Sequence, residues 1–170
     1  MASGKTTFGR ALAKALGWNF IDLDFYIEQR FRKTVREIFA SEGEAGFRQK
    51  ESAMLREAGE FENTVISCGG GTPCFHGNME YMKEAGTTVH LDTMPDVLVR
   101  RLVENNSRRP LMAGKSETEI REEVERGLNA RKEFYHAAEV QFPGNLLENR
   151  SQIDNTVREF IERFMTHSRH

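Results

Sequence analysis

The first ten residues, MASGKTTFGR (residues 1–10), contain the stretch that decides the fold. Within them, SGKTT (residues 3–7) matches the second half of the phosphate-binding loop G-x-x-x-x-G-K-[ST], whose first glycine would precede Met1. In one interpretation this is such a loop, in which Lys5 reaches the β- and γ-phosphates and the Thr6 hydroxyl binds Mg²⁺. In the other, it is a helix N-terminus that reads Gly-Lys-Thr by chance.

The remainder of the chain predicts strands that alternate with helices. Apolar residues at helical spacing place a helix directly after Lys5, with Gly17 as its stop. Strands are expected at 19–24, 64–67, 87–92 and 139–142, and further helices at about 25–40, 46–60 and 77–84, from Pro95, around 120–128 and at 153–164. This alternation favours a parallel sheet covered on both faces. A fifth strand is implied, because a phosphate-binding loop needs a strand that leads into it.

Composition indicates one globular domain over residues 1–170. The chain is 38% hydrophobic and 29% charged, and its net charge of −2 predicts neither nucleic-acid nor membrane binding. It has no apolar run long enough for a membrane span and no signal-peptide pattern, so we expect a cytoplasmic protein with small-molecule partners. Cys68 and Cys74 are too few for a disulfide framework, and we expect reduced thiols.

An acidic pair ends the first expected strand, FIDLD (residues 20–24). Asp22 and Asp24 are separated by one residue, so in a strand both would emerge at the same edge of the sheet. Such a pair can divide its work, with one carboxylate near a metal ion and the other near a substrate hydroxyl. The alternative is a structural turn, with Asp24 as the N-cap of the following helix.

Two arginines are candidates for binding an anion. Arg48 and Glu51, in GFRQKES, stand three residues apart on one expected helix face, where the glutamate can fix the guanidinium fork for a carboxylate. Arg131, in NARKEFY, is a candidate second cation. The alternatives are a surface ion pair at Arg48 and a solvated helix end at Arg131.

Glycines and arginines mark two further segments. The triple glycine at 69–71 directly follows the strand VIS, which indicates a tight turn or a place where a ligand approaches the backbone closely. The polar segment at about 104–117 contains Arg108 and Arg109 before a proline, and we expect a lid that brings positive charge to a transferring phosphoryl group. A turn without a ligand and an idle linker remain the alternatives.

Six motifs together resemble the shikimate kinase family: SGKTT, FIDLD, FRQKE, SCGGGTP, RRP and RKEFY, in this order along the chain. The resemblance implies a P-loop kinase of the nucleoside-monophosphate-kinase-like α/β class. Its three-layer sandwich has a five-stranded parallel sheet and a substrate-binding helical region at about 25–60. The central first strand and the first loop glycine would precede Met1, and we expect the natural protein to have both. The implied reaction is ATP- and Mg²⁺-dependent phosphorylation of the 3-hydroxyl of shikimate by a monomer.

The same resemblance implies a role for each matching residue. Catalysis would depend on Asp24, as the base at the substrate hydroxyl, with Lys5 and Arg109 at the phosphates. ATP would be bound by Ser3, Gly4, Lys5, Thr6, Thr7, Arg101 and Arg109, with Arg101 stacked on adenine. Mg²⁺ would be held near Thr6 and Asp22. Shikimate would be bound by Asp24, Arg48, Gly70, Gly71 and Arg131, with Glu51 orienting Arg48.

Two rival functions remain open at this stage. Another P-loop small-molecule kinase, such as a gluconate kinase, would share the loop and the lid but has no need of two arginines for a ring carboxylate. A truncated, non-catalytic nucleotide-binding protein would bind ATP alone. Separate titrations with ATP and shikimate distinguish the three.

Overall fold

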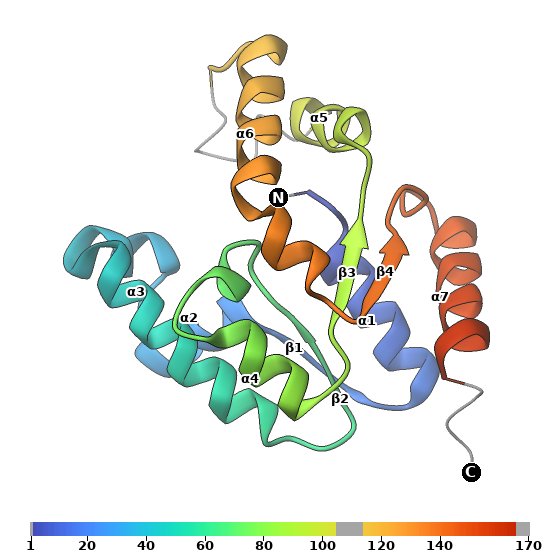
Figure 1. The fold of residues 1–170 in the computed structure, drawn as a ribbon, viewed down its shortest axis with the longest axis horizontal. Coiled ribbons are helices and arrows are strands. Elements are labelled where there is room, and N and C mark those ends of the chain that lie inside the picture. The colour runs from blue at the N-terminus through green and yellow to red at the C-terminus, as the bar shows by residue number, and fades with distance from the viewer. Residues whose placement is uncertain (1, 105–113, 166–170) are drawn as a thin grey trace.

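Helices and strands alternate along the chain, as the sequence predicts (Figure 1). The computed structural model describes residues 2–104 and 114–165. The helices are α1 (Lys5–Leu16), α2 (Leu23–Phe31), α3 (Val35–Gly59), α4 (Asn78–Ala85), α5 (Pro95–Glu104), α6 (Glu117–His136) and α7 (Arg150–Phe164), with a 3₁₀ turn η1 (Thr72–Cys74). The strands are β1 (Asn19–Asp22), β2 (Thr64–Ser67), β3 (Val89–Asp92) and β4 (Val140–Pro143). None of the described helices is both long and apolar enough to cross a membrane.

The four strands form two parallel pairs. Asn19 of β1 lies opposite Thr64 of β2, and Val89 of β3 lies opposite Val140 of β4. Parallel neighbours need a crossover between them, and helices supply it in both pairs. The predicted parallel α/β arrangement is therefore confirmed. The described residues show two separate two-stranded sheets, however, and not the single five-stranded sheet that we expected.

The helices after β1 differ from the prediction. The expected helix at 25–40 is divided, because Arg32 adopts a left-handed conformation (φ 52°) and Thr34 starts a new helix through a capping box with Glu37. The expected second helix at about 46–60 corresponds to the second part of α3. Gly43, at φ 69° and ψ −176°, is non-helical and joins two helical segments at a kink, so the predicted division just before residue 46 is confirmed, although the first of these segments already starts at Val35.

Three apolar clusters hold these elements together. One joins α1, β3, β4 and α7 around the buried rings of Phe8, Phe142 and Phe160. A second joins α2 to α3 through residues such as Ile27 and Ile38, and a third joins α5 to α6. In Figure 1, α2, α3 and α4 lie beside β1 and β2, whereas α5 and α6 lie above β3 and β4.

Candidate active site

The predicted phosphate-binding loop opens α1. Gly4 precedes the helix at φ 89°, a conformation that favours glycine, and a Cβ there would lie 2.6 Å from the Leu147 side chain. Because Gly4 carries no side chain, it leaves the first N–H groups of α1 uncovered, as an anion site at a helix N-terminus requires. The Lys5 ammonium donates to the Ser3 hydroxyl at 3.3 Å. This geometry favours the loop over a chance Gly-Lys-Thr.

Thr6 and Asp22 meet across the base of this loop. The Thr6 hydroxyl, on α1, donates to Oδ2 of Asp22, at the end of β1, at 2.8 Å. A hydroxyl and a carboxylate fit Mg²⁺, which prefers oxygen ligands and completes its shell with water and phosphate oxygens. Asp22 has a second role, because its Oδ1 caps α2 by accepting from the Phe25 N–H at 3.3 Å. The cap is therefore Asp22, and the alternative that placed it at Asp24 is wrong.

Asp24 lies in the first turn of α2, not at the end of a strand as we expected. The strand stops at Asp22 because that residue begins the helix. The Asp24 side chain remains accessible to solvent, yet the surrounding protein removes enough water to raise the pKa of its carboxyl above the ordinary value. The nearby Asp22 and Glu51 raise this pKa further, whereas Lys5 opposes them. A carboxylate in such surroundings is well suited to accept a proton.

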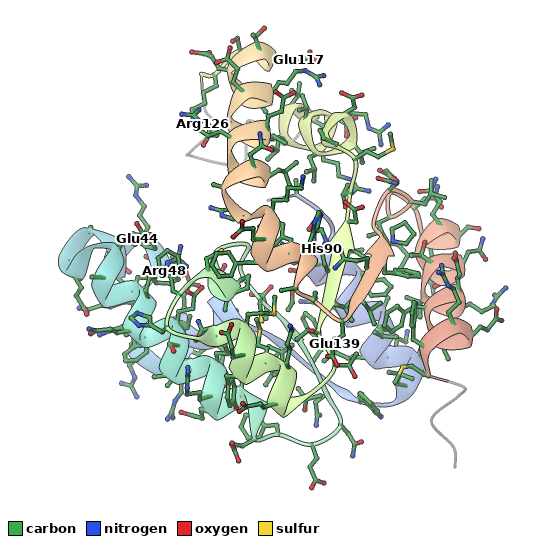
Figure 2. The ribbon with its side chains drawn as sticks, in the orientation of Figure 1. Glu44, Arg48, His90, Glu117, Arg126 and Glu139 are labelled. Carbon is green, nitrogen blue, oxygen red and sulfur yellow. The ribbon has the colours of Figure 1, made fainter. Side chains whose placement is uncertain are left out.

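The Arg48–Glu51 pair is buried rather than superficial. Nη1 of Arg48 donates to Oε2 of Glu51 at 2.7 Å, and the two side chains are only 12% and 1% exposed. The Arg48 guanidinium also lies 4.2 Å from the centre of the Phe75 ring. At the surface it pairs with Glu44, and both residues are labelled in Figure 2. The interpretation as a surface ion pair is therefore wrong, and the arginine is held in one orientation.

A buried polar chain behind Glu51 was missed by the sequence analysis. The Thr72 hydroxyl donates to Oε1 of Glu51 at 2.7 Å, and Asn78 donates to the Thr72 carbonyl at 2.9 Å. Asn78 in turn accepts from Ser52 at 2.8 Å and from Arg56 at 3.0 Å. Thr72 and Asn78 are fully buried, so each polar group needs its partner. Ordinary polar residues carry no sequence signal of such burial.

The triple glycine passes directly beside these groups. A Cβ on Gly71 would lie 2.6 Å from Nη2 of Arg48, although the φ of −91° suits any residue. A Cβ on Gly69 would lie 3.6 Å from Oδ1 of Asp24. The backbone therefore approaches Arg48 closely at Gly71, whereas the distance at Gly69 is an ordinary contact; that a ligand approaches this segment stays a prediction.

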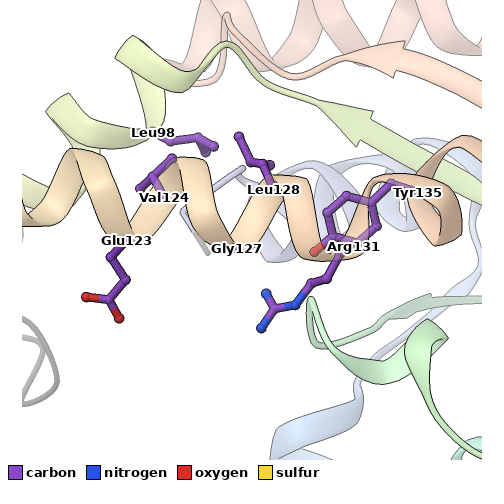
Figure 3. Close-up of a pocket in the computed structure, with 7 residues that line it drawn as sticks. All are labelled: Leu98, Glu123, Val124, Gly127, Leu128, Arg131 and Tyr135. Carbon is purple, nitrogen blue, oxygen red and sulfur yellow. The ribbon is translucent and has the colours of Figure 1, made fainter.

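Arg131 and Arg48 both act electrostatically on Cys74. Burial raises the pKa of the Cys74 thiol, and the positive charges of Arg131 and Arg48 both oppose that shift. Figure 3 shows Arg131 extending from α6 toward the segment after β2. The interpretation as a solvated helix end does not account for this position. The seven residues drawn there line a cavity of about 30 Å³, room for one water molecule, so a larger ligand would lie beside it.

Arg101 links the two loops that flank the phosphate-binding site. It is 12% exposed and donates to the carbonyl oxygens of Ala2 and Gly144 at 3.3 and 3.1 Å, and to Glu148 at 2.9 Å. Its predicted stacking on adenine stays a prediction. Arg108, Arg109 and residues 105–113 of the expected lid lie outside the described residues.

Comparison with known proteins gives consistent matches along the chain. A family model described as shikimate kinase matches residues 1–163. The shikimate kinase of Bacteroides thetaiotaomicron is 49% identical over 162 residues, which make up 95% of this chain and 93% of the relative. The shikimate kinase of Bacteroides fragilis is 50% identical over 159 residues, or 94% of this chain and 89% of the relative.

Solved structures agree with the sequence matches. The crystal structure of the Bacteroides thetaiotaomicron shikimate kinase has a TM-score of 0.92 and 49% identity, and the match covers 95% of this chain and 92% of that one. A structure of the Acinetobacter baumannii shikimate kinase in complex with shikimate has a TM-score of 0.83 and 28% identity, with coverage of 100% and 91%. The similarity therefore extends over nearly the whole of each chain.

Proposed function

The chain belongs to the shikimate kinase family and phosphorylates shikimate with ATP, and we propose how its residues divide this work. The observation that carries the proposal is the position of Asp24. Oδ1 of Asp24 and Oε1 of Glu51 lie 3.6 and 3.5 Å from the position that a Cβ on Gly69 would take, and the charges of Glu51 and Lys5 both act on the Asp24 carboxyl. We therefore place Asp24 between the phosphate-binding loop and the Arg48–Glu51 pair. A base that lies between a nucleotide-binding loop and an arginine held for anion binding fits phosphoryl transfer to an alcohol that also carries a carboxylate.

At the phosphate end, the first turn of α1 and Lys5 bind the nucleotide. The uncovered N–H groups after Gly4 bind phosphate oxygens, and Lys5 places a positive charge at the β- and γ-phosphates. Ser3, Thr7 and Arg101 complete the nucleotide site, and we keep Arg109 as a proposed phosphate ligand on its sequence alone. Thr6 and Asp22 would hold Mg²⁺, which neutralises charge on the transferring group when it is bound.

At the substrate end, Arg48 and Arg131 bind the carboxylate of shikimate. The charges of both guanidinium groups act on Cys74, which supports one carboxylate between them, and Glu51 keeps Arg48 in place. Gly70 and Gly71 let the ring approach the backbone. Asp24 then accepts the proton of the 3-hydroxyl as its oxygen attacks the γ-phosphorus and the bond to the β-phosphate oxygen breaks.

We also infer a fifth parallel strand between β2 and β3, and a monomer as the working form. The strand is supported by the separation of the described strands into two parallel pairs. Tyr135 touches Gly70, just after β2, and His90, in β3, so these two strands are the ones that would flank it. The monomer is supported by the fact that all the residues proposed to bind ligands belong to a single chain.

The experiment that tests this function measures both ligands separately in two variants. Arg48→Ala and Arg131→Ala should each weaken shikimate binding by about ten-fold to more than a hundred-fold, because a charge-assisted hydrogen bond contributes roughly 1.5–3 kcal/mol. ATP binding should stay unchanged in both. Arg30→Ala is the matched control, since it removes an arginine of α2 from a solvent-accessible ion pair with Glu57 of α3. Loss of ATP affinity in place of shikimate affinity would contradict the assignment.

A further inference from the structure

Tyr135 occupies a contact point between two parts of the proposed shikimate site. It lies near the end of α6, one turn after Arg131, and its hydroxyl donates to the Gly70 carbonyl at 2.8 Å. These residues are 65 positions apart in sequence. The hydroxyl thus connects α6, which carries Arg131, to the glycine segment at 69–71, which passes beside Arg48.

Tyr135 also lies one turn from Arg131 on the same helix, and both side chains line one small cavity. Burial raises the pKa of Tyr135, and the nearby Arg131 side chain opposes this shift. The Tyr135 hydroxyl donates its one proton to Gly70, so it holds the turn of α6 that carries Arg131 against the glycine segment. Figure 3 shows the two side chains next to each other on α6.

The Tyr135 ring is itself held in place. It stacks on the His90 ring, with centroids 4.8 Å apart and planes 22° apart. Gln141 contacts His90 at 2.7 Å and donates to the Tyr135 carbonyl at 2.9 Å. The ring position is therefore fixed by β3 and β4, independently of the hydroxyl. Removing the hydroxyl alone would leave this packing intact.

We propose that Tyr135 is a positioning residue for shikimate recognition, because its hydroxyl ties the turn of α6 that carries Arg131 to the backbone of Gly70. This inference rests on the proposed function. A segment of three glycines has little conformational preference of its own, so a fixed partner is needed to hold it at one distance from the arginines. Gly71, the next residue, lies against Arg48, and an anchor at Gly70 therefore also sets where the two arginines stand relative to each other.

The test is Tyr135→Phe, which removes the hydroxyl and keeps the stacked ring. The KM for shikimate should rise by about three- to ten-fold, as expected for one lost hydrogen bond at a binding site. The kcat should change by less than about two-fold and the KM for ATP should not change, because no reacting group is altered. Tyr81→Phe is the matched control, since the Tyr81 hydroxyl also donates to a backbone carbonyl, that of Arg56, at 2.9 Å. Its KM for shikimate should equal that of the unmodified chain.

A double variant shows whether the hydroxyl acts through Arg131. In an Arg131→Ala background, Tyr135→Phe should raise the KM for shikimate no further, because the arginine that it positions is already gone. Equal KM changes in the two phenylalanine variants, or fully additive changes in the double variant, would overturn the inference. An unchanged KM in Tyr135→Phe beside a raised KM in Arg131→Ala would overturn the inference alone. An unchanged KM in Arg131→Ala would overturn the proposed shikimate site and this inference with it.

Discussion

At the phosphate end of the site the Thr6–Asp22 contact lies at the surface, whereas Glu51, which holds Arg48 at the shikimate end, is buried. Thr6 and Asp22 meet in an exposed hydrogen bond, and Lys5 makes a 3.3 Å contact with Ser3. At the other end, Glu51 is 1% exposed and accepts hydrogen bonds at 2.7 Å from two sides.

This difference corresponds to what each end binds. A triphosphate with Mg²⁺ brings many charges and can order flexible exposed groups around itself. Shikimate is smaller and offers one carboxylate and a few hydroxyls, so its site gains more from groups that are already in position. The shikimate end therefore depends on the fold for its geometry, and substitutions there should affect both binding and stability.

The largest effect is expected at Asp24, which lies between the two ends. Asp24→Asn should lower kcat by about 10²–10⁴-fold, because a positioned base is lost, while ATP and shikimate still bind. Steady-state kinetics together with calorimetric titration of each ligand would measure this. A kcat close to that of the unmodified chain would remove Asp24 from the mechanism.

The same variant has a stability consequence of defined sign. The folded chain raises the pKa of Asp24 above its ordinary 3.8, so the stabilisation from the neutral form is complete below that value and is lost as the pH rises through the raised pKa. At neutral pH the ionised carboxylate therefore costs stability. Thermal unfolding at pH 7 with chelator and without ligands should show Asp24→Asn to be at least as stable as the unmodified chain. A clear drop in Tm would contradict this.

One substitution at the phosphate end and one at the shikimate end test whether the two ends differ in their contribution to stability. Glu51→Gln should raise the KM for shikimate by about ten- to a hundred-fold and lower stability by about 1–3 kcal/mol, since buried partners lose a charged acceptor. Thr6→Ala, its counterpart at the phosphate end, should change stability by less than about 0.5 kcal/mol and raise the Mg²⁺ concentration needed for activity. Equal stability losses would mean that the two ends do not differ.

A smaller effect is expected at Gly71, where binding and stability separate. Gly71→Ala should displace the Arg48 guanidinium and raise the KM for shikimate by about ten-fold. Stability should stay within about 0.5 kcal/mol, because the backbone there suits alanine and only the end of a flexible side chain must move. Gly86→Ala, at a glycine with open space around it, is the control. A large stability loss at Gly71 would show that Arg48 cannot move.

The smallest effect concerns thiol labelling. Shikimate should slow alkylation of Cys74 several-fold, because its carboxylate would lie between Arg48 and Arg131 beside that thiol, and ATP alone should not. Cys68 should stay unlabelled at neutral pH, since burial raises the pKa of its thiol to about 12. Mass spectrometry of labelled peptides would measure both. Protection of Cys74 by ATP alone would contradict this assignment, because it would place the nucleotide at the shikimate end of the site.

The sequence by itself determined the local elements. Gly17 ends α1 as predicted, in a left-handed conformation, and all four predicted strands are present. The Arg48–Glu51 pair was also predictable, because residues three apart on a helix are neighbours whatever surrounds them. Each of these predictions depends only on residues within a few positions of one another. The error at Asp24 arose within the same range, since a strand end and a helix start compete for the same few residues.

Only the tertiary structure decided how these pieces combine into a site. The burial of Glu51, its partner Thr72 at a separation of 21 residues, and the contact of Tyr135 with Gly70 all depend on which element faces fold against each other. Threonine, asparagine and tyrosine occur on surfaces and in cores alike, so their identity does not indicate which ones become buried. The cost of leaving a buried polar group without a partner then selects the specific contacts that hold Arg48 and Arg131 in position.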